Sequence, residues 1–240
     1  MRIVCAGDSL TRGVSFIRGR LRIVRDNYPN LLQTRLQTAA YDGVEVKNCG
    51  AFNDNSGSLL NRLQKDVFAE HPDIVLIEIG ANDCDFRWNE VAEAPDVEHV
   101  PYVPLDRYVS NLKHIVKGVH SIGAKPIVLT LLPLDPVRYY HHLSVRFGKQ
   151  IAHWIARCGG IEYWHNQYDK ALRGCLDDLH IDRIDVRAHD GQVATWRTML
   201  SDDGIHLTST GYQYLSRMVF SALEDLGVLP STARVTSSRG

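Results

Sequence analysis

A serine follows the first apolar strand of this chain, at the end where ligands bind in many sheets. The strand, residues 2–6, runs into Gly7-Asp8-Ser9-Leu10, and the glycine permits a tight, exposed turn. In open α/β sheets, ligands bind outside the carboxyl ends of the strands. A nucleophilic serine needs a base, and the base needs a carboxylate that holds its tautomer. Asp203-Gly204-Ile205-His206, far along the chain, contains both residue types.

A second motif follows the third expected strand. Gly80-Ala81-Asn82-Asp83 comes directly after the apolar segment 73–80, and a polar turn, 48–54, comes after the strand before it. If the strands take the order 2-1-3-4-5, both turns flank the first strand and lie near Ser9. Acyl transfer develops a negative oxygen, which a preorganised donor stabilises by ~3 to 4 kcal/mol. We expect the Asn82 amide to be such a donor.

The elements that position these motifs alternate between strand and helix. Strands are expected at 2–6, 44–49, 73–80, 125–132 and 181–187, and helices around 30–40, 57–67, 105–121, 142–158, 162–178 and 208–226. Near-continuous apolar strands are typical of parallel sheets that are covered on both faces. The pattern predicts a doubly wound, three-layer α/β/α sandwich. We expect one domain over 1–229, with a helical insertion at about 133–180 and a flexible tail at 230–240.

Composition restricts the partners. The 240 residues carry a formal net charge of -1, which favours neither nucleic acid nor an anionic membrane as partner. The five cysteines are odd in number and form no C-x-x-C pair, so we expect no disulfide framework and no metal site. Met1 is followed directly by a strand, and no apolar run approaches ~20 residues, which makes a cytoplasmic location the expectation.

Four motifs in order resemble the four blocks of the SGNH (GDSL) hydrolase family. They are Gly7-Asp8-Ser9-Leu10, the turn and helix at 48–63, Gly80-Ala81-Asn82-Asp83 and Asp203-Gly204-Ile205-His206. The resemblance implies a flavodoxin-like fold with a parallel five-stranded sheet and hydrolysis of carboxylic esters or thioesters. It also implies Ser9 as nucleophile, His206 as base with Asp203 as its partner, and Asn82 in the oxyanion hole. It implies neither a metal nor a cofactor.

One position departs from the family pattern. The second block usually carries a glycine whose backbone N–H serves the oxyanion hole, and Asn53 occupies that position here. A backbone donor needs no particular side chain, and asparagine tolerates positive φ better than most residues. We therefore expect Asn53 to supply the second donor, with Gly50 or Gly57 as the alternatives.

Three long segments leave the ends of strands and are expected to form the rim of the pocket: 14–29, 84–104 and 133–142. With the residue beside Ser9, they supply the candidate substrate contacts Asp8, Trp88, Arg138 and Tyr139. The arginines of 12–25 have two interpretations, an anion-binding group or a solvated hairpin, and interleaved aliphatic residues favour the second.

We expect the substrate to be a small soluble ester such as an O-acetylated sugar. A longer acyl chain, as in a lysophospholipase or thioesterase, is the alternative, and Phe52, Phe86, Trp88 and Val91 are candidates for one wall of its groove. A non-catalytic carbohydrate-binding module on the same scaffold is a hypothesis from another class. Flavin or nucleotide binding is less favoured, because 7–13 lacks both phosphate-binding glycine spacings.

Overall fold

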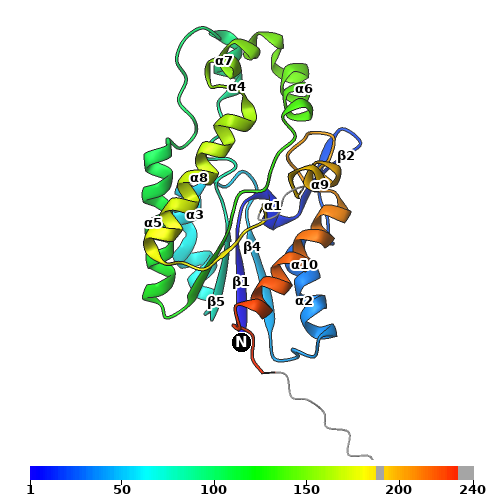
Figure 1. The fold of residues 1–240 in the computed structure, drawn as a ribbon, viewed down its shortest axis with the longest axis vertical. Helices are drawn as coiled ribbons and strands as arrows, with labels where there is room; N and C mark the ends of the chain where they lie inside the picture. Colours follow the sequence, from blue (N-terminus) through cyan, green and yellow to red (C-terminus); the bar gives the residue numbers. More distant parts are fainter. Residues whose placement is uncertain (188–191, 232–240) are drawn as a thin grey trace, which may run out of the picture.

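The centre of the fold is a parallel sheet of five strands (Figure 1). A computed structural model describes residues 1–187 and 192–231. The strands are β1 (Arg2–Gly7), β4 (Glu45–Gly50), β5 (Ile74–Glu78), β6 (Lys125–Leu129) and β7 (Arg183–Ile184). They lie in the order β4-β1-β5-β6-β7 and all neighbours are parallel, which confirms the predicted order 2-1-3-4-5.

Helices cover both faces of the sheet. One face carries α3 (Ser56–Arg62), α5 (Leu105–Ser121) and α8 (Ile161–Leu179), and the other carries α2 (Tyr28–Thr38) and α10 (Ser209–Asp225) (Figure 1). Side chains of β1 alternate between the two cores: Val4 and Ala6 pack in the first, and Ile3 and Cys5 in the second. All four are fully buried, as expected for a central strand with both faces covered.

Several helices begin where a polar side chain accepts from one of the first backbone N–H groups. Asn27 accepts from the Asn30 N–H at the start of α2, and Thr208 accepts from the Gly211 N–H at the start of α10. Asn55 and Ser58 form a capping box on α3. That helix continues through a π-helical segment, Leu63–Val67, and a short 3-10 turn, Phe68–Glu70.

A third apolar cluster lies beyond the carboxyl ends of the strands, among the helices at the top of Figure 1. It packs under α4 (Trp88–Glu93), α6 (Pro136–Phe147) and α7 (Ala152–Arg157), which we call the cap helices. The prediction of a single helix over 142–158 is wrong, because the helix is interrupted at Gly148, where φ is 94°. The segment 84–104 was expected as a rim and contains α4, whose Trp88 and Val91 are buried.

Two more elements differ from the expectation. The fifth strand pairs with β6 over only two residues, Arg183 and Ile184, and α9 (Gln192–Met199) was not predicted. The arginine-bearing segment forms the hairpin of β2 (Val14–Ile17) and β3 (Arg20–Ile23), as the second interpretation expected. No helix within the described ranges is long and apolar enough to cross a membrane. Most of the tail expected at 230–240 lies outside the described residues.

The end of β4 approaches the turn after β1 so closely that only glycine fits at residue 50. A Cβ atom on Gly50 would lie 2.2 Å from the backbone nitrogen of Arg12 and 2.6 Å from the carbonyl carbon of Thr11. Both neighbours are backbone atoms of α1 (Ser9–Arg12), so they cannot rotate away. The approach sets the position of α1 against the sheet.

We predict that Gly50→Ala displaces α1 and lowers the free energy of unfolding by about 1 to 3 kcal/mol, the usual cost of overpacking. Urea unfolding followed by circular dichroism measures the change. Gly43→Ala is the matched control, because a Cβ atom there has no neighbour within 4 Å. Equal stability of the two variants would contradict this account of the contact.

Candidate functional site

A chain of hydrogen bonds links Ser9, His206 and Asp203. The Ser9 Oγ lies 3.1 Å from the His206 Nε2, and the His206 Nδ1 lies 2.6 Å from the Asp203 Oδ2. Ser9 is the first residue of α1, and Asp8 caps that helix by accepting from the Leu10 N–H. All three residues are largely buried, and all three line the same cavity. The sequence-predicted triad residues are therefore together, in the order nucleophile, base, carboxylate.

Asp203 is held in its ionised form. Burial raises the pKa of its carboxyl, but hydrogen bonds from the His206 ring and from the backbone of residues 205 and 206 outweigh that effect, and the pKa lies below its usual value. The Asp203 Oδ1 accepts from the backbone N–H of Ile205 at 3.2 Å and of His206 at 3.1 Å. An anionic Asp203 requires the His206 Nδ1 to be the donor, so the Nε2 of a neutral ring is free to accept from Ser9.

The turn that carries Asp203 and His206 packs against the start of α6. Gly204 has a φ of 79°, and a Cβ atom there would lie 2.7 Å from both the Asp135 carbonyl oxygen and the Tyr139 nitrogen. The Asp135 N–H donates to the Gly204 carbonyl at 2.8 Å. A glycine is required at 204 both by the left-handed backbone and by this close approach.

Asn82 and Asn53 line the same cavity as Ser9. The Asn82 Nδ2 donates to the Asp54 carbonyl at 2.7 Å and lies 3.4 Å from the Asp8 Oδ2. An amide nitrogen carries two hydrogens, so one N–H of Asn82 is engaged only by this long contact.

Asn53 has a φ of 59°, the left-handed conformation that asparagine tolerates. Its turn is fixed to β1, because the Ala51 N–H donates to the Gly7 carbonyl at 2.9 Å. Within the part of the chain that the structure describes, the Asn53 N–H donates to no protein acceptor. A backbone donor and a side-chain donor therefore lie on the wall of the cavity that contains Ser9.

The cavity has a volume of about 620 Å³ and extends from the triad to the cap helices. Its far wall is largely apolar, and includes Phe86, Leu134, Trp154, Ile155 and Ile161. Of the expected substrate contacts, Asp8, Trp88 and Tyr139 line it. The Trp88 Nε1 and the Tyr139 hydroxyl both donate to the Asp85 Oδ1, at 2.7 and 2.9 Å, so these two side chains are fixed by the half-buried Asp85 carboxyl.

Arg138 does not line the cavity, contrary to the expectation. Its guanidinium donates to the backbone carbonyls of Arg197 and Leu200, each at 3.1 Å, and lies 3.6 Å from the Asp135 carboxylate. The side chain therefore ties α6 to the segment before the Asp203 turn. The sequence showed Arg138 in a rim segment, but it did not show which side of α6 faces the cavity.

A pair of buried carboxyls beneath the nucleophile turn was missed by the sequence analysis. Asp8 and Glu78 are each 1% exposed, and the Thr11 hydroxyl donates to the Glu78 Oε2 at 3.1 Å. Burial raises the pKa of Glu78 to about 7, and burial together with the adjacent Glu78 raises the pKa of Asp8 well above its usual value. Two adjacent carboxyls that are largely removed from water disfavour ionisation of both at once. The available signal was a single glutamate within the apolar strand β5.

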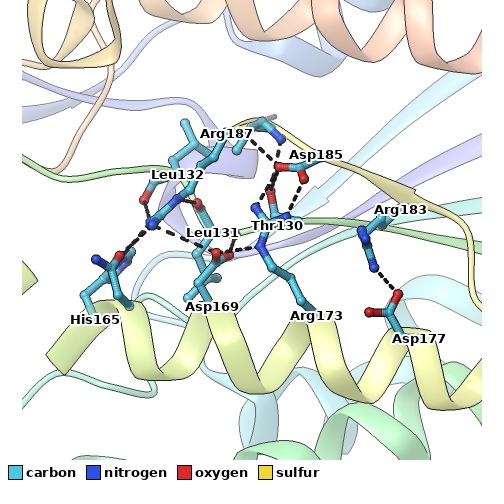
Figure 2. A network of polar contacts seen from close by, with 12 residues as sticks. Thr130, Leu131, Leu132, His165, Asp169, Arg173, Asp177, Arg183, Asp185 and Arg187 are labelled. Carbon is cyan, nitrogen blue, oxygen red and sulfur yellow. Dashed lines mark hydrogen bonds and ion pairs between the residues drawn. The ribbon is translucent and has the colours of Figure 1, made fainter. Parts of the chain in front are cut away.

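A polar network between α8 and the sheet was also missed (Figure 2). It is made of Asp169, Arg173, Asp185 and Arg187. The Asp169 Oδ1 accepts from the Leu131 N–H at 2.9 Å, and an Arg187 Nη2 donates to the Leu132 carbonyl at 3.0 Å. The network thereby fixes the segment after β6, which continues along the cavity wall to α6. In the described ranges, no three His, Cys, Asp or Glu side chains gather as metal ligands would.

The raised pKa of Glu78 makes a prediction about stability. The unfolded glutamate ionises near 4.5 and the folded one near 7, so the folded state binds the extra proton between these values. Stability from this group is complete below about 4.5 and is lost as the pH rises through about 7.

We expect Glu78→Gln to lack this loss. The free energy of unfolding of the wild type minus that of the variant should therefore fall by on the order of 1 to 3 kcal/mol from about pH 4.5 to pH 8. Urea titrations at several pH values give the difference, and Glu93→Gln, at an exposed position of α4, is the control. A constant difference for Glu78→Gln would show that the buried pair holds no extra proton.

Known proteins resemble this chain in sequence or in fold. The curated lipoprotein YqeF of Bacillus subtilis (strain 168), described as uncharacterized, is 28% identical over 238 residues, covering 95% of this chain and 89% of YqeF. A lipase/acylhydrolase of Enterococcus faecalis superposes with a TM-score of 0.67 at 20% identity, covering 94% of this chain and 96% of that one. Axe2, an acetylxylan esterase of Geobacillus stearothermophilus, gives a TM-score of 0.63 at 20% identity, with 92% and 93% covered.

The sequence pattern of the GDSL-like lipase/acylhydrolase family matches residues 5–214, which contain both the Ser9 turn and the Asp203–His206 turn. The two solved structures show that the fold is shared, and the family match covers most of the chain. The chain belongs to the GDSL-like lipase/acylhydrolase family and is a carboxylic ester hydrolase.

Proposed function

We propose that the protein hydrolyses carboxylic esters through an acyl-enzyme on Ser9, with His206 as general base and Asp203 as its partner. The observation that carries the proposal is the 3.1 Å contact from the Ser9 Oγ to the His206 Nε2, backed by the 2.6 Å contact from the His206 Nδ1 to Asp203. His206 takes the proton as Ser9 attacks the carbonyl carbon, and gives it to the departing alcohol. Water then attacks the acyl-enzyme by the same steps and releases the acid.

The negative oxygen that forms in each step needs donors on the side of the carbonyl opposite to the base. We assign this role to the backbone N–H groups of Ser9 and Asn53 and to the amide of Asn82. The position of all three residues on one cavity wall supports the assignment, as does an Asn53 N–H that has no acceptor among the described residues. The bond from Asn82 to the Asp54 carbonyl orients the amide without using its second hydrogen.

A small acyl group, most simply acetyl, on a soluble or carbohydrate alcohol is the first candidate substrate. The similarity in fold to an enzyme named acetylxylan esterase supports it, and the aromatic side chains Trp88 and Tyr139 in the cavity offer flat surfaces for a sugar ring. We propose that such an ester is the small-molecule partner of the enzyme. We also propose that the enzyme acts in the cytoplasm.

A longer acyl chain is the second candidate, and one observation favours it. The cavity of about 620 Å³ is larger than an acetyl group needs, and its far wall is apolar. Of the side chains expected to line an acyl groove, Phe52, Phe86 and Trp88 do line the cavity, whereas Val91 is buried in the cluster behind it.

The mechanism predicts that Ser9→Ala lowers kcat for p-nitrophenyl acetate by about 1,000-fold or more, because loss of the nucleophile removes the covalent route. Release of p-nitrophenol measures the rate. Ser121→Ala, at the exposed end of α5, is the matched control and should keep the wild-type rate. Equal turnover by Ser9→Ala and wild type would contradict the assignment of Ser9. No turnover by either protein would favour a binding module on this scaffold.

The two substrate candidates differ in how the rate depends on chain length. For a small-acyl esterase we expect kcat/KM to fall by about tenfold or more from the acetyl to the decanoyl ester, since a long chain must then stay in water. An acylhydrolase that places the chain in the apolar cavity should show the reverse order. Measurements on p-nitrophenyl esters of stepwise length, below their micelle-forming concentrations, separate the two.

A further inference from the structure

His165 is a polar side chain in the apolar part of the cavity, and the mechanism does not use it. It lies in the first turns of α8, is 4% exposed, and lines the cavity together with Leu132 and Ile161. Nothing in the triad or among the oxyanion donors contacts it. A buried imidazole normally has partners for both ring nitrogens, so its bonds show what it can offer to a ligand.

Arg187 determines the tautomer of this ring. An Arg187 Nη2 lies 3.1 Å from the His165 Nδ1, and Figure 2 shows the guanidinium between His165 and the carbonyl of Leu132. A guanidinium has donors and no acceptor, so the His165 Nδ1 must accept. The proton of a neutral ring is then on Nε2, and that nitrogen is a donor.

The ring also stays neutral. Burial, reinforced by the positive charge of Arg187, lowers the pKa of His165 to about 3. Arg187 is the charged group in contact with the His165 ring. The next charged group is the Asp169 carboxylate, whose Oδ2 lies 3.9 Å from the Arg187 Nη1. Asn166 takes another N–H of the same guanidinium, at 2.6 Å, which further fixes the arginine in place.

The Nε2 donor has no protein partner within the ranges 1–187 and 192–231, although its ring is on the cavity wall. We propose that His165 is a specificity-determining residue whose Nε2–H binds an oxygen atom of the substrate inside the cavity. This inference rests on the proposed ester hydrolysis and goes further: the part of the substrate in the cavity carries a hydroxyl, ether or carbonyl oxygen. A plain alkyl group leaves a buried donor unpaired, which disfavours it.

Matched substrates test the proposal. On the acyl side, p-nitrophenyl heptanoate is paired in turn with analogues in which an ether oxygen replaces one methylene. The position of the ether oxygen differs from one analogue to the next. The other pair is cyclohexyl acetate and tetrahydropyran-4-yl acetate, which samples the alcohol side. In each pair the ratio of kcat/KM, ether over alkyl, is compared between wild type and His165→Phe.

We expect this ratio to fall by about fivefold in His165→Phe in at least one pair, the usual worth of one hydrogen bond. His114→Phe, at an exposed position of α5, is the matched control and should leave the ratio unchanged. Equal ratios for wild type and His165→Phe in both pairs would overturn the proposal. Failure of the ester-hydrolase assignment itself is recognised separately, by turnover that survives Ser9→Ala.

A second measurement uses the wild-type protein alone, so it depends neither on an activity assay nor on a variant that folds. Long-range ¹H–¹⁵N spectra of the labelled wild type report the tautomer of each histidine, and His165 is identified by paramagnetic or through-bond assignment. We expect a neutral ring with its proton on Nε2 between about pH 5 and 8. A proton on Nδ1, or titration within that range, would overturn the proposal.

Discussion

The contact between Ser9 and His206 joins two turns that are 197 residues apart, and the rest of the fold makes this contact possible. One turn follows the central strand β1, and the other precedes α10, which packs beside α2 over the same face of the sheet. Because β1 lies between β4 and β5, the turns that carry Asn53 and Asn82 end on either side of Ser9. A different strand order would separate the nucleophile from its candidate oxyanion donors.

The segment after β6 supports the site from the opposite side. Asp169 and Arg187 hold its first residues, and Asp135 at its end bonds the backbone of Gly204, next to Asp203. Buried ion-pair networks contribute little net stability in general, because desolvation offsets the attraction between charges. Here the network has a geometric consequence, since it fixes a cavity wall and the backbone against which the Asp203 turn packs.

Sequence reasoning found the parts of the site that depend on local motifs. The turn after β1 and the spacing of Asp203 and His206 follow from residue types and from apolar periodicity. The sheet order was instead implied by the resemblance to the SGNH (GDSL) hydrolase family. Features that depend on long-range packing were missed. The carboxyl next to Asp8 belongs to a glutamate 70 residues away. Arg138 is on a side of α6 that faces away from the cavity, so its guanidinium bonds backbone carbonyls there. The break at Gly148 was also missed, and the contact between His165 and Arg187 depends on how α8 packs beside the segment after β7.

The central claim is that Ser9 is the nucleophile and that its environment activates it. The most direct measurement is the reaction of the native protein with a fluorophosphonate, followed by intact-mass and peptide mass spectrometry. A serine activated by His206 attacks the phosphorus, displaces fluoride and forms a stable phosphonate ester whose tetrahedral phosphorus mimics the tetrahedral intermediate. The account predicts one adduct per chain, on the peptide that contains Ser9. It predicts no adduct when the protein is unfolded before the reagent is added. An unreacted protein, or an adduct on a different residue, would contradict it.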